Sequence, residues 1–449
     1  MKNSNEINAP RLLIFGYLGI ILVGTLILSL PISTTKGISV VDALYTASSS
    51  LCVTGLIVKN TAVDFTLFGK SIILILIQIG GLGYMTLSTT FFFFLGRKIS
   101  LRERVLFKES INVLSYNNLK RFAWRVFRIT LFLELIGTLL FFFSFLDKFP
   151  PLIALGHAFF HSVSSFCNAG LSSFSENLSL FQNSVSVPLI SAALFIIGGL
   201  GFVVISDLYT TLFNRTKKRL SLHSIIVLRT TLILIAVGTL FILLYEGGRS
   251  LSGFTFGKQI VISFFQSVTP RTAGFNTVNI SLFSPITLVM LMLFMFIGAS
   301  PGGTGGGMKT TTCVLLVKWL KELLLGRHDS DISTFKKRIP IEQAFRSFVI
   351  VSLGIFVIGI AFFLIMLFDE PEPLKVLFEI FSALGTVGLS LGSSVNPYCS
   401  FSYDLSAISK LVIIAVIVTG RVGTITIGSA LLRPHLLEYK YPEEPIMVG

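Results

Sequence analysis

Four short loops carry the residues with the clearest chemical potential, and each loop places a glycine at a matching position. The loops run from Ser50 to Leu56, Ser165 to Leu171, Val268 to Phe275 and Ser382 to Leu389. Their glycines are Gly55, Gly170, Gly274 and Gly388, which are separated by nearly equal lengths of chain. One motif that recurs at a near-constant period indicates an internal repeat.

Glycine tolerates positive φ, so the backbone of such a loop can turn its carbonyl oxygens toward an axis that no side chain blocks. Four such loops around one axis would form rings of oxygens that replace the hydration shell of a cation. Helices that end at the loops would add the partial negative charge of their C-termini. The pattern predicts a cation filter made of Val53, Thr54, Gly55, Asn168, Ala169, Gly170, Thr272, Ala273, Gly274, Thr386, Val387 and Gly388. The alternative is four tight turns in a helical scaffold.

The composition indicates that apolar helices position these loops. Hydrophobic residues make up 53% of the chain and charged residues 13%, whereas soluble domains carry about 25% charged residues. We therefore expect a multi-pass membrane protein in a lipid bilayer. The net charge of +14 does not indicate nucleic-acid binding, because the basic residues are not gathered on an aromatic-rich polar module. Most of them lie in five segments, Met1–Arg11, Arg97–Arg128, Arg215–Arg229, Lys318–Arg346 and Arg433–Gly449, which places both termini and three linkers in the cytoplasm.

Each repeat is expected to contain a spanning helix, a short re-entrant pore helix, a filter loop and a second spanning helix. Runs of 17 to 25 apolar residues cross a hydrocarbon core of about 30 Å, whereas segments of 10 to 14 do not. The predicted first helices are Leu12–Leu30, Ile129–Leu146, Ile225–Leu244 and Phe345–Phe368, the pore helices Val40–Ser50, Ile153–Phe166, Phe256–Val268 and Glu372–Ala383, and the second helices Phe68–Leu95, Val187–Phe213, Pro285–Leu325 and Leu405–Leu432. The first run is too long for a signal-peptide core.

This reading gives an all-α integral membrane fold with eight transmembrane helices around a central pore. The repeats occupy residues 1–96, residues 97–214 with a basic cytoplasmic linker, residues 215–330 and residues 331–433, and a C-terminal tail covers residues 434–449. Non-helical backbone at membrane depth is tolerated only where it lines a wet cavity or is buried in protein. The four loops are therefore expected to converge on one aqueous axis.

The second helices carry small-residue patches, of which the third is greatly expanded. The patches Gly80–Gly83 and Gly198–Gly201 are best explained by close helix packing. The stretch Gly298–Gly307 cannot remain an ordinary helix, because each glycine costs about 1 kcal/mol and an interior proline about 3 kcal/mol. It predicts an intramembrane loop just beneath the filter, with Gly302, Gly303, Thr304, Gly305, Gly306 and Gly307 as a gate. A phosphate-binding loop is rejected, because Met308 separates Gly307 from Lys309, so we expect no nucleotide on this chain.

Arg421 replaces a glycine in the fourth patch, Gly420–Gly423, and lies deep in the last apolar run. A charge at mid-membrane costs at least about 2.5 kcal/mol and usually faces a water-filled path or a partner. We expect Arg421 to line the pore as part of the gate, where its charge would repel a permeating cation. A structural pairing with carbonyl groups of the loop from Ser300 to Gly307 is an alternative compatible with this role.

Other polar residues are weaker candidates. His157 and His161 have a spacing that suits a metal ion, but no third ligand is visible, so polar packing is favoured. Asp42 and Glu379 lie in the first and fourth short helices, where we expect caps or outer-mouth charge. Glu134 stands in an apolar run and is a candidate for coupling a second ion. The four cysteines show no C-x-x-C spacing and are expected in packing or loop positions.

These fourfold motifs, the helix-loop-helix repeats and the glycine patches resemble the membrane subunit of the Trk/Ktr/HKT family of potassium transporters, the Ktr branch in particular. The resemblance covers nearly the whole chain. It implies K+ selectivity, because a Ser in the first filter loop accompanies Na+ preference in that family and all four positions here are Gly. It also implies a loop gate, a homodimer with one pore in each protomer, and a cytoplasmic ring of KtrA-like nucleotide-binding regulatory subunits.

The sequence therefore predicts gated K+ uptake across the cell membrane, with moderate discrimination against Na+. One alternative is a Na+- or H+-coupled K+ symporter that uses Glu134. An alternative of another class is a membrane enzyme, which would need paired His or carboxylate side chains at a common depth. No convincing set of this kind is present in the sequence.

Overall fold

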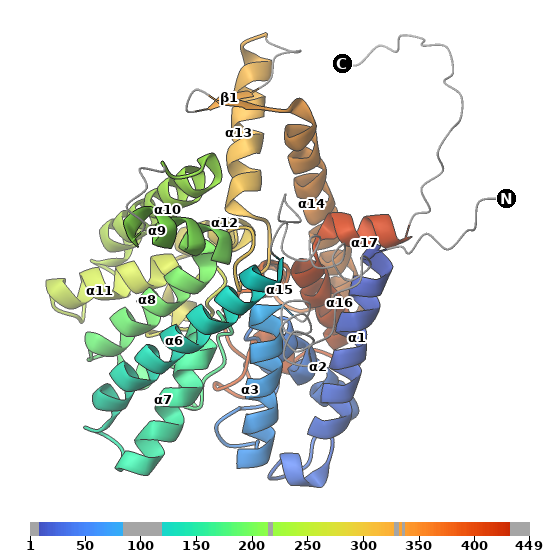
Figure 1. Cartoon of the computed structure of the whole chain (residues 1–449). Coiled ribbons are helices and arrows are strands. Elements are labelled where there is room, and N and C mark those ends of the chain that lie inside the picture. The colour runs from blue at the N-terminus through green and yellow to red at the C-terminus, as the bar shows by residue number, and fades with distance from the viewer. Residues whose placement is uncertain (1–8, 84–118, 214–218, 327–331, 335–336, 432–449) are drawn as a thin grey trace.

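The structure is a computed structural model that describes residues 9–83, 119–213, 219–326, 332–334 and 337–431. Within these residues the protein is almost entirely helical (Figure 1). The strands β1 (Ile332–Thr334) and β2 (Lys337–Ile339) form one short antiparallel hairpin, in which Ile332 pairs with Ile339. The helices repeat in one order along the chain, which is long helix, short helix, loop and a further helix, and this last helix is interrupted in the second, third and fourth repeats.

Each repeat begins with a long apolar helix. These helices are α1 (Ala9–Leu28), α6 (Leu119–Phe145), α10 (Leu222–Glu246) and α14 (Ile341–Asp369). All four are long and apolar enough to cross a membrane. They leave large apolar side chains exposed, among them Phe15, Phe132, Leu232 and Phe363. Apolar surface on this scale indicates contact with lipid, so the chain is a multi-pass membrane protein.

The second helix of each repeat is short and ends where a filter loop begins. These helices are α2 (Val40–Leu51), α7 (Pro151–Phe166), α11 (Phe256–Val268) and α15 (Pro373–Gly385), close to their predicted bounds. Proline occupies the first turn of α7 and α15, where its missing N–H leaves no bond unmade. In α2 the side chain of Ser39 accepts a hydrogen bond from the N–H of Asp42. At 1.5 Å per residue, 12 to 16 residues are too short for a typical hydrocarbon core.

Short 3-10 helices lie in the connections around the short helices and the filter loops. They are η1 (Pro31–Ser33), η2 (Ser179–Phe181), η3 (Ile280–Leu282) and η4 (Phe401–Tyr403). Each connection leads to the third helical region of its repeat or, for η1, to the short helix. They are the turns that return the chain along the bundle.

The prediction of unbroken second spanning helices in repeats two and four is wrong. Helix α8 (Ser186–Leu200) meets α9 (Phe202–Phe213) at 96°, and α16 (Ala407–Val422) meets α17 (Thr424–Leu431) at 101°. The last glycine of each patch, Gly201 or Gly423, has φ of +95° or +99° and ψ of 141° or 136°, an extended conformation with positive φ that glycine tolerates and that ends the helix. Helix α3 (Leu67–Leu82) likewise ends at Gly83 with φ +76°, and the rest of its predicted span lies outside the described residues.

The third repeat is interrupted over a longer stretch, as the sequence predicts. Helix α12 (Pro285–Phe296) is followed by the non-helical segment 297–309, and α13 (Thr310–Leu324) resumes the helix. The two ends of the segment pair through a bridge between Ile297 and Met308. Helix α13 continues beyond the bundle to the β hairpin (Figure 1), which falls in the predicted basic linker and was not anticipated.

The first and last described elements lie side by side at one end of the molecule (Figure 1). The guanidinium Nε of Arg11 in α1 donates a hydrogen bond of 2.9 Å to the carbonyl of Ala430 in α17. A large hydrophobic core also joins the first repeat to the fourth, with Leu51 and Ile73 in the same cluster as Ile380 and Ile413. The four repeats therefore close into a ring.

Candidate ion filter and gate

The four predicted filter glycines meet at the centre of this ring. A Cβ added at Gly55 would stand 2.9 Å from the Cα of Gly170, and one at Gly170 would stand 3.1 Å from the Cα of Gly274. A Cβ at Gly274 would be 3.1 Å from the Cα of Gly388, and one at Gly388 would be 2.9 Å from the Cα of Gly55. The loops thus follow one another around an axis in chain order. Any side chain at these four positions would come too close to backbone atoms of the next loop.

The space beside each glycine is filled by a carbonyl oxygen of the next loop. The added Cβ atoms would lie 2.6, 3.0, 2.2 and 2.2 Å from the oxygens of Ala169, Ala273, Val387 and Thr54 in turn. All four glycines have positive φ, between +67° and +95°. The packing and the backbone conformation therefore each require glycine, for separate reasons.

The residue two positions before each glycine also has positive φ, although none of these residues is glycine. The angles are 56° at Val53, 59° at Asn168, 73° at Thr272 and 49° at Thr386, whereas the residue between each pair has no positive φ. The four loops therefore share one alternation of positive and non-positive φ, which is neither helix nor strand. Such conformations cost about 1–3 kcal/mol each outside glycine, so the surroundings must hold these loops in place.

Hydrogen bonds from the ends of the short helices hold the loops. The N–H groups of Thr54, Ala169 and Val387 each donate to a serine carbonyl five residues earlier, at 2.8 Å. Side-chain hydroxyl groups add a second bond: Ser49 Oγ accepts from the N–H of Gly55 and Ser382 Oγ from that of Gly388, at 3.1 and 3.0 Å. Ser164 and Thr269 instead donate to carbonyl groups just after the glycine. A Ser or Thr five or six residues before every glycine was a readable signal that the sequence reasoning missed.

The interrupted segment 297–309 lies directly against two filter loops. The N–H of Gly306 donates a 3.0 Å hydrogen bond to Thr386 Oγ1 in the fourth loop. A Cβ at Gly305 would stand 2.0 Å from Thr272 Oγ1 in the third loop. The predicted gate residues are therefore in contact with predicted filter residues.

Backbone hydrogen bonds join the same segment to the glycine patches of two other repeats. The N–H groups of Thr304 and Ser300 donate to the carbonyls of Gly198 and Gly199, at 3.2 and 3.0 Å. On the fourth repeat, the N–H of Gly307 donates to the carbonyl of Gly420 at 3.1 Å. The patches also pack closely, as expected: a Cβ at Gly80, Gly198 or Gly420 would lie within 2.1 Å of a carbonyl oxygen near the end of a short helix.

Two basic side chains complete the contacts of the segment. The guanidinium of Arg421 donates to the carbonyl of Thr304 and to that of Gly80 in the first repeat. Lys309 Nζ donates to the carbonyls of Gly305 and Gly306, at 2.8 and 3.1 Å. The expected pairing of Arg421 with this loop is present, whereas the sequence reasoning gave Lys309 no role.

A cavity of about 880 Å³ lies next to the segment, between it and the described ends of several helices. Gly302, Gly305 and Gly307 line it together with Arg421. Among the described residues that line it, the charged ones are the basic Lys309, Arg346 and Arg421, with His223 beside them. A cation in this space would meet positive charge with no carboxylate from those residues.

The weaker candidates take structural positions. His157 Nδ1 lies 2.7 Å from Ser173 Oγ, and His161 Nε2 lies 3.0 Å from Ser172 Oγ, which is the expected polar packing. Glu134 is 4% exposed and accepts a 3.2 Å hydrogen bond from Gln78 behind the second filter loop. Its carboxylate does not line the large cavity as far as the described residues define it.

Asp42 lies in the first turn of α2 and pairs with Lys410 at 3.0 Å. The expectation for Glu379, a cap or an outer-mouth charge, is wrong. Its side chain is 1% exposed, and its Oε1 accepts hydrogen bonds from the N–H and Oγ of Ser402, at 3.0 and 2.6 Å. The partner is more than 20 residues away along the chain, so helical position alone did not reveal it.

Comparison with known proteins identifies the family. A family model described as TrkH, cation transport protein, matches residues 19–438. The Ktr system potassium uptake protein B of Vibrio alginolyticus is 35% identical over 442 residues, covering 98% of this chain and 95% of that protein. The potassium/sodium uptake protein NtpJ of Enterococcus hirae is 35% identical over 457 residues, covering 99% and 98%.

The fold agrees with a solved structure. The crystal structure of the potassium transporter TrkH from Vibrio parahaemolyticus matches with a TM-score of 0.75 and 21% identity, over 96% of this chain and 86% of that one. This likeness shows that the two chains share a fold. With the full-length relatives and the family model, it places the protein among transporters rather than enzymes, and the chain belongs to the TrkH family of cation transport proteins.

Proposed function

We propose that the protein takes up K+ through the ring of filter loops. The observation that carries this proposal is the contact of each filter glycine with a carbonyl oxygen of the next loop, around a closed ring. Backbone oxygens in such a ring replace the water that a cation loses on entry. The relatives named as potassium uptake proteins over nearly their full length support K+ as the cargo.

The loops discriminate by backbone geometry rather than by charge. Val53 to Gly55 and the three equivalent tripeptides contain no acidic residue, so nothing in them favours a small, strongly charged cation over K+. Each loop has one glycine where the K+ channel signature has two. We therefore propose K+ selectivity with moderate discrimination against Na+.

The segment Gly302–Gly307 acts as a gate under the filter, and Arg421 holds it closed. Its hydrogen bonds to Gly198, Gly420 and Thr386 and its contact with Arg421 support this role, because they fix a glycine-rich segment that would otherwise be mobile. The basic lining of the cavity supports a closed state, since it raises the energy of a cation there. Opening would move the segment and Arg421 together.

The same proposal includes the setting of the protein in the cell. Both termini face the cytoplasm, following the basic segments, and the protein forms a homodimer with one pore per protomer. Relatives named for the Ktr system support a cytoplasmic KtrA-like regulatory partner. The linkers Arg97–Arg128 and Lys318–Arg346 would meet this partner or the anionic membrane surface, and the hairpin β1–β2 lies within the second linker.

A second candidate is coupled transport of K+ with Na+ or H+. The relative named potassium/sodium uptake protein favours it. The burial of Glu134 behind the filter weakens its assignment as the coupling group. Coupling predicts that K+ uptake carries a stoichiometric second ion and declines in Glu134→Gln.

Rubidium uptake by liposomes that contain the purified chain tests the proposal. We expect uptake driven by voltage, competition by K+, and weaker competition by Na+. Gly55→Ser should lower the preference for K+, because it adds a side chain where 2.6 Å separates the Cβ position from the Ala169 oxygen. An unchanged K+/Na+ ratio in folded Gly55→Ser would refute the filter, and absence of uptake by the wild-type chain would refute passive conduction.

A further inference from the structure

The junction between the first and fourth repeats differs from the other three, because its two partners are not neighbours in the chain. It is nevertheless tight: a Cβ at Gly388 would stand 2.2 Å from the carbonyl oxygen of Thr54. The loops on both sides depend on α2 and α15, the short helices that precede them. Side-chain contacts must therefore hold these two helices in register.

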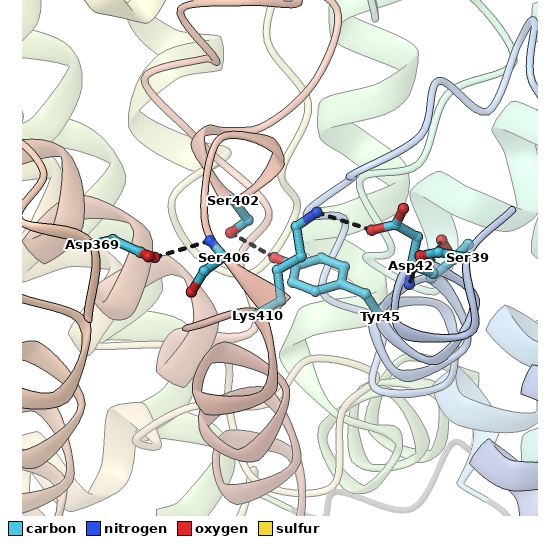
Figure 2. Close-up of polar contacts among 8 residues, drawn as sticks. Ser39, Asp42, Tyr45, Asp369, Ser402, Ser406 and Lys410 are labelled. Carbon is cyan, nitrogen blue, oxygen red and sulfur yellow. Dashed lines mark hydrogen bonds and ion pairs between the residues drawn. The ribbon is translucent and has the colours of Figure 1, made fainter. Parts of the chain in front are cut away.

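A buried chain of hydrogen bonds connects the middles of the two helices. Tyr45 Oη, on α2, donates to Ser402 Oγ at 2.8 Å. Ser402 donates in turn to Glu379 Oε1 on α15, from its Oγ at 2.6 Å and from its N–H at 3.0 Å. Tyr45 and Ser402 are fully buried, and Glu379 is 1% exposed. Figure 2 shows the ring of Tyr45 reaching toward Ser402 across the junction.

Two further contacts close the junction around this chain. Lys410 Nζ, in the first turn of α16, lies 3.0 Å from Asp42 Oδ1 in the first turn of α2 (Figure 2). The N–H of Ile57, just after the first filter loop, donates to Ser400 Oγ at 2.9 Å. The N–H of Ser400 donates to the carbonyl of Ile57 at 2.9 Å. The short helix α2, which precedes the first filter loop, and Ile57, which follows the loop, are thus both attached to the fourth repeat.

We propose that Tyr45, Ser402 and Glu379 are positioning residues that set the K+/Na+ selectivity of the filter by fixing the first loop against the fourth. A buried polar group costs free energy unless it is hydrogen-bonded, and the bonds from Tyr45 to Ser402 and from Ser402 to Glu379 Oε1 are kept only when α2 and α15 hold this register. A small slide of either helix would move the Thr54 oxygen relative to Gly388. K+ and Na+ differ in radius by a fraction of an ångström, so such a slide changes selectivity before it changes the fold.

This inference rests on the proposed transport function and adds the residues that tune it. Tyr45→Phe is the sharpest variant, because it removes one oxygen and leaves the buried ring. We expect the K+/Na+ selectivity ratio, measured by competition with rubidium uptake into liposomes, to fall by up to about five-fold, the factor that the full free energy of one hydrogen bond represents, while the maximal rate stays within about two-fold. Tyr398→Phe is the matched control, since Tyr398 is 45% exposed in an outer loop and should keep the wild-type ratio.

Two further variants test the link itself. Ser402→Ala removes the middle of the chain, so the double variant with Tyr45→Phe should be no worse than either single variant, as expected for residues that act together. Glu379→Gln keeps an oxygen acceptor and should retain most of the selectivity, whereas Glu379→Leu should lose it. Additive losses in the double variant, or equal losses in both Glu379 variants, would overturn the inference.

The controls separate this inference from the function beneath it. Absence of selective uptake by the wild-type chain refutes the proposed function. Selective wild-type uptake with an unchanged ratio in folded Tyr45→Phe refutes only the positioning role. If Tyr45→Phe does not elute as a folded protein in detergent, the ratio in Ser402→Ala decides in the same way, and an unchanged ratio there also refutes the role.

Discussion

The filter end of the molecule is nearly fourfold, whereas the region beneath it is not. Every filter loop has the same two positive φ angles and the same contact with the next loop. Beneath the loops, the described helices α8 and α16 break at a single glycine, but the third repeat opens into the thirteen-residue segment 297–309. The two regions share repeats and differ in symmetry.

This difference in symmetry follows from the different tasks that we propose for the two regions. The filter uses backbone carbonyls, so tripeptides as different as Val53 to Gly55 and Asn168 to Gly170 can take the same shape. A gate in a narrow path needs only one movable part. In the proposed gate the third repeat supplies this part, the carbonyls of Gly198 and Gly420 bind it, and the Gly80 carbonyl binds Arg421.

The largest effect is expected from a variant in the nearly fourfold filter loops. In Gly274→Ala the new Cβ would lie 2.2 Å from the Val387 oxygen at a φ of +73°, which requires the backbone to move. We expect rubidium uptake to fall to the level of empty liposomes. Gly170→Ala, whose nearest contact is 3.0 Å, should keep measurable uptake with lower selectivity. Equal loss in both variants would show that strain in φ, not contact across the ring, requires glycine.

The next largest effect is expected when part of the segment 297–309, which has no counterpart of this length in the other described repeats, is deleted. Deletion of Gly303–Gly306 takes away the bonds to Gly198 and Thr386 and the Arg421 contact. At about 1 kcal/mol for each neutral bond and about 1.5–3 kcal/mol for the charged one, their loss should favour the open state by roughly a hundredfold or more. Rubidium flux should rise accordingly while the K+/Na+ ratio stays near wild type, because the filter is intact.

The deletion has its own control. Size-exclusion chromatography in detergent must show that the shortened protein is folded, and rubidium flux is then compared at equal protein per liposome. A folded variant with unchanged or abolished flux would argue that the segment is structural support for Thr272 and Thr386 and not a barrier.

A smaller increase is expected when only the side chain that holds the gate is changed. Arg421→Gln removes the charge that binds the Thr304 and Gly80 carbonyls. Charged hydrogen bonds contribute about 1.5–3 kcal/mol each, but only the bond to Thr304 holds the segment, and Lys309 still binds Gly305 and Gly306, so flux should rise about tenfold. Arg421→Lys should fall between wild type and Arg421→Gln. An unaltered rate in both would assign Arg421 to packing.

The sequence predicted the features that depend on neighbouring residues and missed those that depend on distant ones. The four loop glycines that meet in the structure and the bounds of the short helices were readable from a local motif and a change in apolar run length. The positive φ of Val53 or Thr386 was not, because these conformations are imposed by packing of other loops. The bond from Tyr45 to Ser402 joins residues 357 positions apart, and no periodic pattern encodes such a pair.

The breaks in α8 and α16 were missed for a related reason. Glycines inside an apolar run are typical of close helix packing as well as of helix ends. The patches here do both, since Gly198 packs against the Phe166 carbonyl and Gly201 ends the helix. Only the three-dimensional packing distinguishes the two roles within one patch.

The smallest expected effect tests the helix breaks without touching the gate. Gly423 has φ of +99° and open space beside it, the nearest atom being 3.8 Å from an added Cβ, so Gly423→Ala adds strain but no clash. We expect a loss of about 1–3 kcal/mol in stability, the cost of a sparsely populated backbone conformation outside glycine, seen as a few degrees lower thermal unfolding in detergent. Gly359→Ala, within α14 and also in open space, should be neutral or slightly stabilising, because helix-interior glycine is unfavourable relative to alanine. Equal melting temperatures for the two variants would mean that the bend at Gly423 relaxes freely, and the break would then be a property of the membrane-facing packing and not of the glycine.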